Sequence, residues 1–356
     1  MAATARLARS STVTEIVRDQ LRPRLSAIDA GEYPDGVLRA LGAAGAFAHH
    51  VGDAPDGLLG AVDAMAEAGE ACLSTAFCAW CQDALVWYLA RAEEAAPRRH
   101  LDALAAGERL GGTGLSNPMK ALAGIEPLAL QGQREGRGYR VRGRLPWVSN
   151  LGPGHRFAGI FSLPDGRRVM GLFEAGTETV ALSANARFVA LEGTGTYTVL
   201  VRDAYLADED VISHDVAAFL PRIRNGFVLL QTGMGIGLAR GVAALMRADA
   251  RGRRDGAFLP LGPDAIEARA AALRERVAVA ARSHGAEDRA TFLDTLRLRL
   301  EVSLLALEAA QAAMLQFGAR GYLEGSEPFR RLREAQFVAI VTPSVKHITT
   351  ELARGV

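Results

Sequence analysis

The feature that most constrains the fold is a change in sequence pattern at Gly111 and again near residue 213. Residues 13–108 carry apolar side chains at helical spacing and predict a series of helices. From Gly111 to about residue 212, short alternating segments separated by Gly-rich turns predict β-strands. Four long amphipathic segments with short connections follow and favour an antiparallel helix bundle. We therefore predict an α+β protein with three domains, at 1–110, 111–213 and 214–356.

Composition narrows the function class. Of 356 residues, 49% are hydrophobic and 23% are charged, as in ordinary globular proteins. The formal net charge of +1 gives no support for nucleic-acid binding, which usually requires a basic excess. No apolar run of about 18 residues predicts a membrane span, and the first residues lack the apolar core of a secretory signal. We expect a cytoplasmic protein with no membrane partner.

Two local patterns resemble ligand sites but have simpler explanations. Cys78 and Cys81 are three residues apart in a predicted buried helix, and Cys72 precedes Cys78 by six residues. A metal site would need further ligands, and none is spaced nearby, so we interpret the cysteines as small core residues and predict no metal site. The Gly-rich run 233–237 imitates a phosphate loop, but it lies inside a helical pattern with no strand before it. That run favours close helix packing.

One predicted strand ends with a large ring and a hydroxyl on the same face. Trp147 is one of three tryptophans, and Ser149 follows two residues later. Alternation along a strand places both side chains on one side. The ring could cover the core of the β domain while Ser149 and Asn150 form a turn, or the pair could contact a flat ligand.

Four segments, taken in order, resemble the acyl-CoA dehydrogenase superfamily of flavoproteins. They are similar to its Leu-Thr-Glu-Pro segment, its Trp-Ile-Thr-Asn strand, the strand that leaves its β domain, and its Phe-Gly-Gly-x-Gly-Tyr helix-end segment. They occupy residues 114–118, 138–150, 193–212 and 317–336. The order helices, strands, helices is also that of the family, so the resemblance covers nearly the whole chain. It implies a helical N-terminal domain, a β-barrel-like central domain and a C-terminal four-helix bundle.

The resemblance implies a bound flavin, FAD with FMN as an alternative. In the family, a tryptophan packs near the flavin ring and a hydroxyl residue after it faces the reactive edge of the ring. The matching residues in this sequence are Trp147 and Ser149. Leu115 and Ser116 match the segment that opens the β domain, and Ser344 matches a family threonine that approaches the adenosine side of the flavin.

The resemblance also implies phosphate contacts across a subunit interface. Gly318 and Gly321, with Arg320 between them, match a family segment that reaches the cofactor of a neighbouring subunit. Arg254 matches an arginine with the same role, although the spacing to Phe258 is one residue longer than in the family. A homodimer or homotetramer follows. The alternatives are a simple helix end at Gly318 and a solvated turn at Arg254.

The usual catalytic base of the family is missing. Counted from Arg333, the position of the family glutamate is Thr342, whose hydroxyl cannot accept the α-proton of an acyl thioester. The alternative base position, on the helix over residues 222–235, has no acidic residue. His347 is the nearest candidate by sequence, although a helix histidine can equally be structural. Glu324 and Glu327 come next.

We therefore expect an FAD-dependent oxidoreductase acting on an acyl thioester such as an acyl-CoA, or on a related small organic substrate. Its electron partner would be an electron-transfer flavoprotein or a flavin reductase. The alternatives are a flavin-dependent monooxygenase of the same fold, in which no protein carboxylate is needed, and a non-catalytic oligomeric helical scaffold.

Overall fold

A computed structural model describes residues 12–52, 54–184, 186–251 and 256–355. Its N-terminal part is helical, as the sequence predicted. A π-helical turn, Val17–Leu21, continues the first helix, and 3₁₀ turns join several of the others. The helices are α1 (Val13–Ile16), α2 (Leu25–Asp29), α3 (Asp35–Ala43), α4 (Gly57–Ala71), α5 (Leu73–Ala90) and α6 (Leu101–Ala105).

The central part is a mixed sheet with one inserted helix, α7 (Ser116–Leu122). The described strands are β1 (Gly111–Thr113), β2 (Leu130–Glu135), β3 (Gly138–Val148), β4 (Arg156–Ser162), β5 (Arg168–Glu174), β6 (Val180–Ser183), β7 (Tyr197–Ala207) and β8 (Val211–Ser213). They run in the order β6-β7-β3-β2-β4-β5-β8, and β1 pairs in parallel with β4.

The sheet does not close, so the prediction of a β-barrel-like domain is wrong. Among the described strands, β6 and β8 form the two edges and do not pair with each other. Closure needs hydrogen bonds between the first and last strands of the order, and β8 is only three residues long. Helices cover one side instead: Ile160, Met170 and Ile212 of the sheet join the core cluster of the helices.

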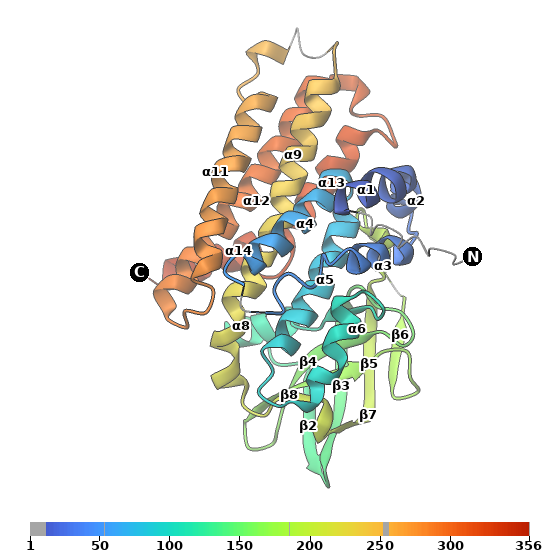
Figure 1. Cartoon of the computed structure of the whole chain (residues 1–356), viewed down its shortest axis with the longest axis vertical. Helices are drawn as coiled ribbons and strands as arrows, with labels where there is room; N and C mark the ends of the chain where they lie inside the picture. Colours follow the sequence, from blue (N-terminus) through green and yellow to red (C-terminus); the bar gives the residue numbers. More distant parts are fainter. Residues whose placement is uncertain (1–11, 53, 185, 252–255, 356) are drawn as a thin grey trace, which may run out of the picture.

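The C-terminal part is again helical. The described helices are α8 (Val216–Leu230), α9 (Thr232–Ala248), α11 (Pro263–Arg282), α12 (Arg289–Phe317), α13 (Glu327–Ile340) and α14 (Val345–Arg354). The first long segment that we expected is divided into α8 and α9 at Gln231. Figure 1 shows the strands at one end of the molecule, the long C-terminal helices at the other, and α4 and α5 between them.

Helix α5 is the central element of the fold. All residues from Leu73 to Leu89 are buried, and the segment has a single charged residue, Asp83, which pairs with the buried His50 at 2.9 Å. Cys78 and Cys81 lie on this helix as buried free thiols, and burial raises the pKa of both. The helix therefore has no solvent-facing side.

Helices α4 and α9 pack at backbone contact. The glycines at 233, 237 and 241 are four residues apart, and a Cβ atom at each would lie 2.7, 2.2 and 2.3 Å from the carbonyl oxygens of Val62, Ala66 and Glu70. These distances leave no room for a side chain. The interpretation of the 233–237 run as a helix-packing segment is thus confirmed.

Two helical stretches are long and apolar enough to cross a membrane by length and composition alone: Val216–Ala248 and Arg289–Arg320. The most apolar window of the first is 83% buried inside the fold, as expected of a core helix, and that of the second is 44% buried. The absence of a membrane partner therefore remains a prediction.

Candidate functional site

A cavity of about 500 Å³ lies between the sheet and the helices. Its walls come from the end of β3, from α5, α7 and α8, from the segment 186–196, and from α13 with the turn that follows it. The volume is within the range of small-molecule and cofactor sites. Four of the predicted site residues line this one cavity: Ser116, Trp147, Ser149 and Thr342.

One wall of the cavity is rich in hydroxyl groups. Ser149 Oγ is 2.7 Å from Thr196 Oγ1, which is 2.8 Å from Thr194 Oγ1. Ser116 Oγ and Thr342 Oγ1 form a second pair at 2.9 Å, although they are 226 residues apart in sequence. Such hydroxyls can turn to donate to acceptors on a ligand edge.

Another part of the lining is aromatic. Phe77 stacks on Trp80 with ring centroids 5.6 Å apart, and its ring meets the edge of Phe337 at 4.5 Å. Trp80 in turn meets Phe227 edge to face at 5.2 Å. Both indole nitrogens of α5 already donate to backbone carbonyls, Trp80 Nε1 to that of Phe227 and Trp87 Nε1 to that of Ile223. This wall can pack against an apolar or flat group and exclude water.

The end of β3 places Trp147 and Ser149, the ring and the hydroxyl discussed in the sequence analysis, at the cavity. Val148 faces the core of the sheet, whereas the side chain of Trp147 is 60% exposed and that of Ser149 is 8% exposed. Asn150 follows with a positive φ of 61°, and its amide donates to Gly111 O while its oxygen accepts from Tyr33. The first interpretation, in which the Trp147 ring covers the core of the β domain, is wrong, because that ring is not part of the apolar core of the sheet. Trp147 and Ser149 line a cavity instead, and their contact with a flat ligand stays a prediction.

Two cations of the cavity were missed by sequence reasoning. Lys120 lies one turn after Ser116 on α7, and its ammonium is 3.4 Å from Glu126. Arg187 lies on the segment that precedes Leu191. The spacing of Ser116 and Lys120 was a usable signal, since residues four apart share a helix face. Among the described residues that line the cavity, none is an aspartate or glutamate.

The predicted residues after Thr342 turn away from the cavity. Ser344 is the N-cap of α14, and its hydroxyl accepts from His347 N at 3.2 Å. His347 is 8% exposed and does not line the cavity, and its buried Nδ1 has no hydrogen-bond partner. Leu115 is buried just before α7, also outside the cavity lining. None of these three predicted residues lines the cavity.

The predicted phosphate-binding residues lie elsewhere. Gly318 ends α12 with a φ of 55°, as the helix-end alternative proposed. Arg320 pairs with Asp249 at 2.9 Å, and neither Gly318 nor Gly321 lines the cavity of its own chain. Arg254 lies outside the described residues. Glu324 and Glu327 are also absent from the described lining of the cavity.

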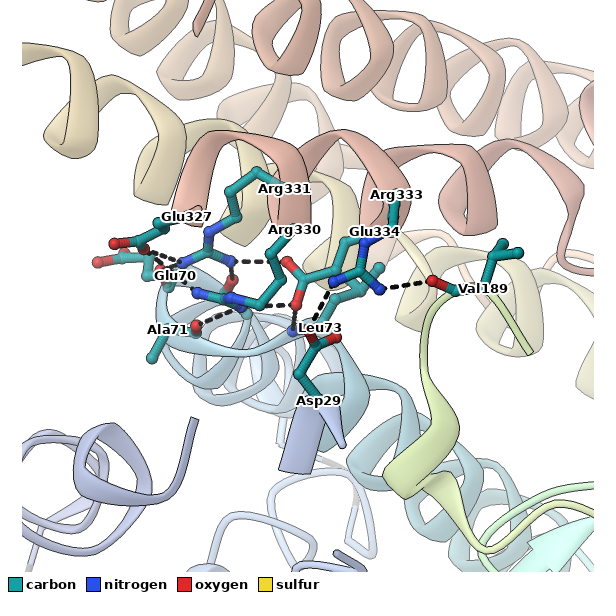
Figure 2. Close-up of polar contacts among 11 residues, drawn as sticks. Asp29, Glu70, Ala71, Leu73, Val189, Glu327, Arg330, Arg331, Arg333 and Glu334 are labelled. Carbon is teal, nitrogen blue, oxygen red and sulfur yellow. Dashed lines mark hydrogen bonds and ion pairs between the residues drawn. The ribbon is translucent and has the colours of Figure 1, made fainter. Parts of the chain in front are cut away.

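A buried ion network fixes two walls of the cavity to each other (Figure 2). Glu334 on α13 binds Arg330 at 2.7 Å and Arg331 at 3.0 Å, and its carboxylate also accepts from Leu73 N, the first residue of α5. The two arginines donate to the last carbonyls of α4, from Gly69 to Ala71. The end of α4 and the start of α5 are therefore capped by α13.

Arg333, on the same helix, holds a third wall. It donates to the carbonyl of Val189 and pairs with Asp29 of α2 at 2.5 Å. Val189 lies in the segment that brings Arg187 and Leu191 to the cavity. One helix, α13, thus contacts both the start of α5 at Leu73 and this segment at Val189 (Figure 2).

The buried state of His347 predicts a pH effect on stability. Burial lowers the pKa of His347, so the unfolded chain binds a proton more readily than the folded chain. Its contribution to the free energy of unfolding is complete above the unfolded pKa of about 6.5 and is lost as the pH falls below that value. We expect urea midpoints to fall less between about pH 7.5 and about pH 5.5 in His347→Gln than in the wild type. An equal fall in both proteins would contradict this origin of the pH effect.

The comparisons with known proteins agree with the fold. Residues 5–108 match the family model "Acyl-CoA dehydrogenase, N-terminal domain". A search of curated protein sequences finds no match. Similar solved structures span nearly the whole chain. Butyryl-CoA dehydrogenase from Megasphaera elsdenii is 15% identical, with 96% of this chain and 95% of that chain covered and a TM-score of 0.82.

Two further structures bear on the cofactor of such proteins. A glutaryl-CoA dehydrogenase from Mycobacterium smegmatis, in complex with FADH2, is 16% identical, with 97% and 92% of the chains covered and a TM-score of 0.74. An FAD complex of PigA is 15% identical, with 96% and 95% covered and a TM-score of 0.77. The N-terminal part thus matches the family by sequence and the whole chain has its fold, which confirms the resemblance to the acyl-CoA dehydrogenase superfamily.

Proposed function

We propose that this protein is a flavin-dependent oxidoreductase that binds the ring system of FAD in the cavity at the end of β3. The observation that carries the proposal is the convergence of Trp147, Ser149, Ser116 and Thr342 on one cavity, from two parts of the chain far apart in sequence. The FAD and FADH2 complexes of proteins with the same fold support it. FMN would fit the same ring-binding residues.

The residues present suit a flat ring with acceptors on its edges. The exposed ring of Trp147 offers a stacking surface, and the hydroxyls of Ser149 and Ser116 can donate to ring oxygens and nitrogens. When bound, the flavin would supply the two-electron redox chemistry. The aromatic wall of Phe77, Trp80 and Phe337 would face the substrate and keep water out.

The proposed substrate class rests on proteins with the same fold. We propose an acyl thioester or a related small organic molecule, in keeping with butyryl-CoA dehydrogenase and glutaryl-CoA dehydrogenase of the same fold. The hydroxyl of Thr342 can donate a hydrogen bond to a substrate carbonyl but cannot accept an α-proton as a carboxylate does.

Flavin-dependent monooxygenation is a second candidate. The observation that favours it is the absence of any aspartate or glutamate among the described residues of the cavity lining. Bleaching of the flavin by substrate without oxygen would identify a dehydrogenase. Bleaching only by an added reductant, followed by oxygen-dependent product, would identify a monooxygenase served by a flavin reductase.

The first test is the absorption spectrum of the purified protein. A flavoprotein absorbs at about 450 nm because of its oxidised cofactor. We expect this absorption either in the protein as isolated or after addition of FAD or FMN. A protein that stays colourless with both flavins would contradict the proposal and favour the non-catalytic scaffold. A cytoplasmic location remains a proposal beside this one.

The end of β3 gives a residue-level test. We expect Trp147→Ala to weaken flavin binding by roughly 1–3 kcal/mol, as for loss of a stacked aromatic ring. Ser149→Ala should weaken it by about 1 kcal/mol, as for loss of one hydrogen bond. Fluorescence titration with FAD measures both. Tyr205→Ala, at an exposed aromatic of β7 outside the cavity lining, is the matched control. Unchanged affinity in both test variants would exclude this part of the cavity as the flavin site.

We further propose a homodimer or homotetramer. Gly318, Arg320 and Gly321 do not line the cavity of their own chain, so a phosphate contact from them would reach the cavity of another subunit. Tyr322 and Leu323 beside them are 79% and 64% exposed, as expected of side chains that a second subunit covers. Sedimentation velocity tests this expectation, and a monomer that still binds flavin tightly would refute it.

A further inference from the structure

Arg299 on α12 is a fully buried cation without an acidic partner. Its side chain is 0% exposed, and no ion pair among the described residues includes it. By contrast, the equally buried Arg331 is neutralised by Glu334 at 3.0 Å. Burial lowers the pKa of Arg299 to about 10, so the guanidinium remains charged at neutral pH. A buried charge without a counter-ion is unfavourable for folding alone.

Hydrogen bonds hold the guanidinium in one orientation. Nε donates to Gln231 Oε1 at 2.9 Å, Nη2 donates to the carbonyl of Val338 at 2.7 Å, and Nη1 donates to Ser303 Oγ. All three partners are neutral acceptors. They fix the direction of the group and leave its positive charge uncompensated.

A chain of hydrogen bonds leads from this cation to the cavity. Gln231, which separates α8 from α9, donates from Nε2 to the carbonyl of Thr342 at 2.8 Å. The hydroxyl of Thr342 is 2.9 Å from that of Ser116, and both residues line the cavity. The hydrogen bonds thus run from α12 through the helix break at Gln231 to the backbone of Thr342, whose side chain belongs to the hydroxyl pair.

The charges on the cavity wall have the same sign. Lys120 and Arg187 line the cavity, and the described lining includes no carboxylate. Glu126 pairs with Lys120 at 3.4 Å, and the two side chains are 35% and 32% exposed. His347 is a buried imidazole outside the cavity lining, and the charges that act on it are those of Glu351 and Lys120. No described acidic group balances Arg299 from the helices packed against it.

We propose that Arg299 is a positioning residue, which through Gln231 orients the Thr342–Ser116 hydroxyl pair and keeps the cavity electropositive, so that the ligand group bound at this pair carries negative charge. This inference rests on the proposed flavin function. There, the group is the edge of the ring that becomes negative when electrons are added, or an oxyanion of the substrate. A positive charge at a fixed distance in a dry site stabilises such a group without moving.

Sulfite binding to the flavin-loaded protein tests the proposal without a substrate. Sulfite adds to oxidised flavin through its sulfur lone pair and leaves the negative charge on the ring, so its dissociation constant reports the local potential. We expect Arg299→Gln, which keeps a donor and removes the charge, to weaken sulfite binding at least about fivefold, the lower end of usual coupling between two sites. Arg299→Lys keeps the charge and should retain most of the affinity.

A second variant and a second probe keep the test decisive. Gln231→Met leaves the cation but breaks the link to Thr342, and we expect it to weaken sulfite binding as well. It therefore serves as the test variant if Arg299→Gln does not fold. Binding of benzoate against its neutral analogue benzamide, measured on the protein with or without flavin, should favour benzoate in the wild type. That preference should fall in Arg299→Gln, which removes one charge while Lys120 and Arg187 remain. A protein that prefers benzoate but takes up no flavin would refute the flavin function alone. A flavin-loaded protein whose sulfite affinity and benzoate preference are unchanged in folded variants would refute the role of Arg299 alone.

Discussion

Butyryl-CoA, octanoyl-CoA and isovaleryl-CoA are expected to be desaturated very slowly by this protein, even with its flavin bound. Positioned general bases contribute typically about 10²–10⁴ in rate, and Thr342 stands where a base is expected. No described residue of the cavity lining is an aspartate or glutamate, and His347 lies outside that lining. Assays with an artificial electron acceptor measure this rate directly.

Installing a base should raise the rate. Thr342→Glu, with Pro343→Gly to restore the turn of the family, is expected to recover part of the factor of about 10²–10⁴ if the cavity accepts the thioester. Thr342→Gln with the same Pro343→Gly change is the matched control, since it has the same shape and cannot take a proton. Ordinary enzyme turnover by the wild type would show that another group acts as the base. Glu327 is a poor candidate, because it pairs with Arg330 and does not line the cavity.

Replacing Glu334 with alanine is expected to lower the free energy of unfolding by about 3–5 kcal/mol, the usual effect of breaking a buried ion pair by removing one partner. The change would leave Arg330 and Arg331 buried without their shared carboxylate and Leu73 N without its acceptor. Urea or guanidinium denaturation measures the difference.

The same network supplies the control for this prediction. Glu327 also contacts Arg330, at 3.2 Å, but its side chain is 43% exposed. Exposed ion pairs contribute about 0–1 kcal/mol, so Glu327→Ala should change the unfolding free energy far less than Glu334→Ala. Equal effects of the two substitutions would mean that burial of Glu334 is not what makes the network important.

The sequence predicted the elements whose pattern is local. Helical spacing in the N-terminal and C-terminal parts and alternation between Gly111 and residue 212 give the observed order of helices and strands, except for α7, a helix in the region predicted as strands. Alternation also brought Trp147 and Ser149 to one cavity. Closure of the sheet is not local, because it depends on whether β6 meets β8, and nothing in either strand specifies that pairing.

The rest of the candidate site depends on contacts between distant segments. Ser116 and Thr342 are 226 residues apart, and their hydrogen bond follows from the packing of α7 against the turn after α13. Arg299 has the same sequence signature as the exposed arginines around it on α12, since burial and the lack of a counter-ion are visible only in the folded chain. The phosphate contacts predicted for Gly318 and Gly321 involve another subunit and stay predictions.

The complete burial of α5 has a consequence for how the chain can be divided. The family match ends at residue 108, which suggests an N-terminal module that could be produced alone. Yet α5, within that module, is buried along its whole length, and its partners include Phe227 of α8, Phe337 of α13 and the network of Glu334. A fragment ending near residue 110 would expose those surfaces to water and lose the caps at the α4–α5 junction. The segment that matches the family model is therefore shorter than the unit that folds. Truncation of this chain for expression or crystallisation should keep α8, α13 and the turn at Thr342.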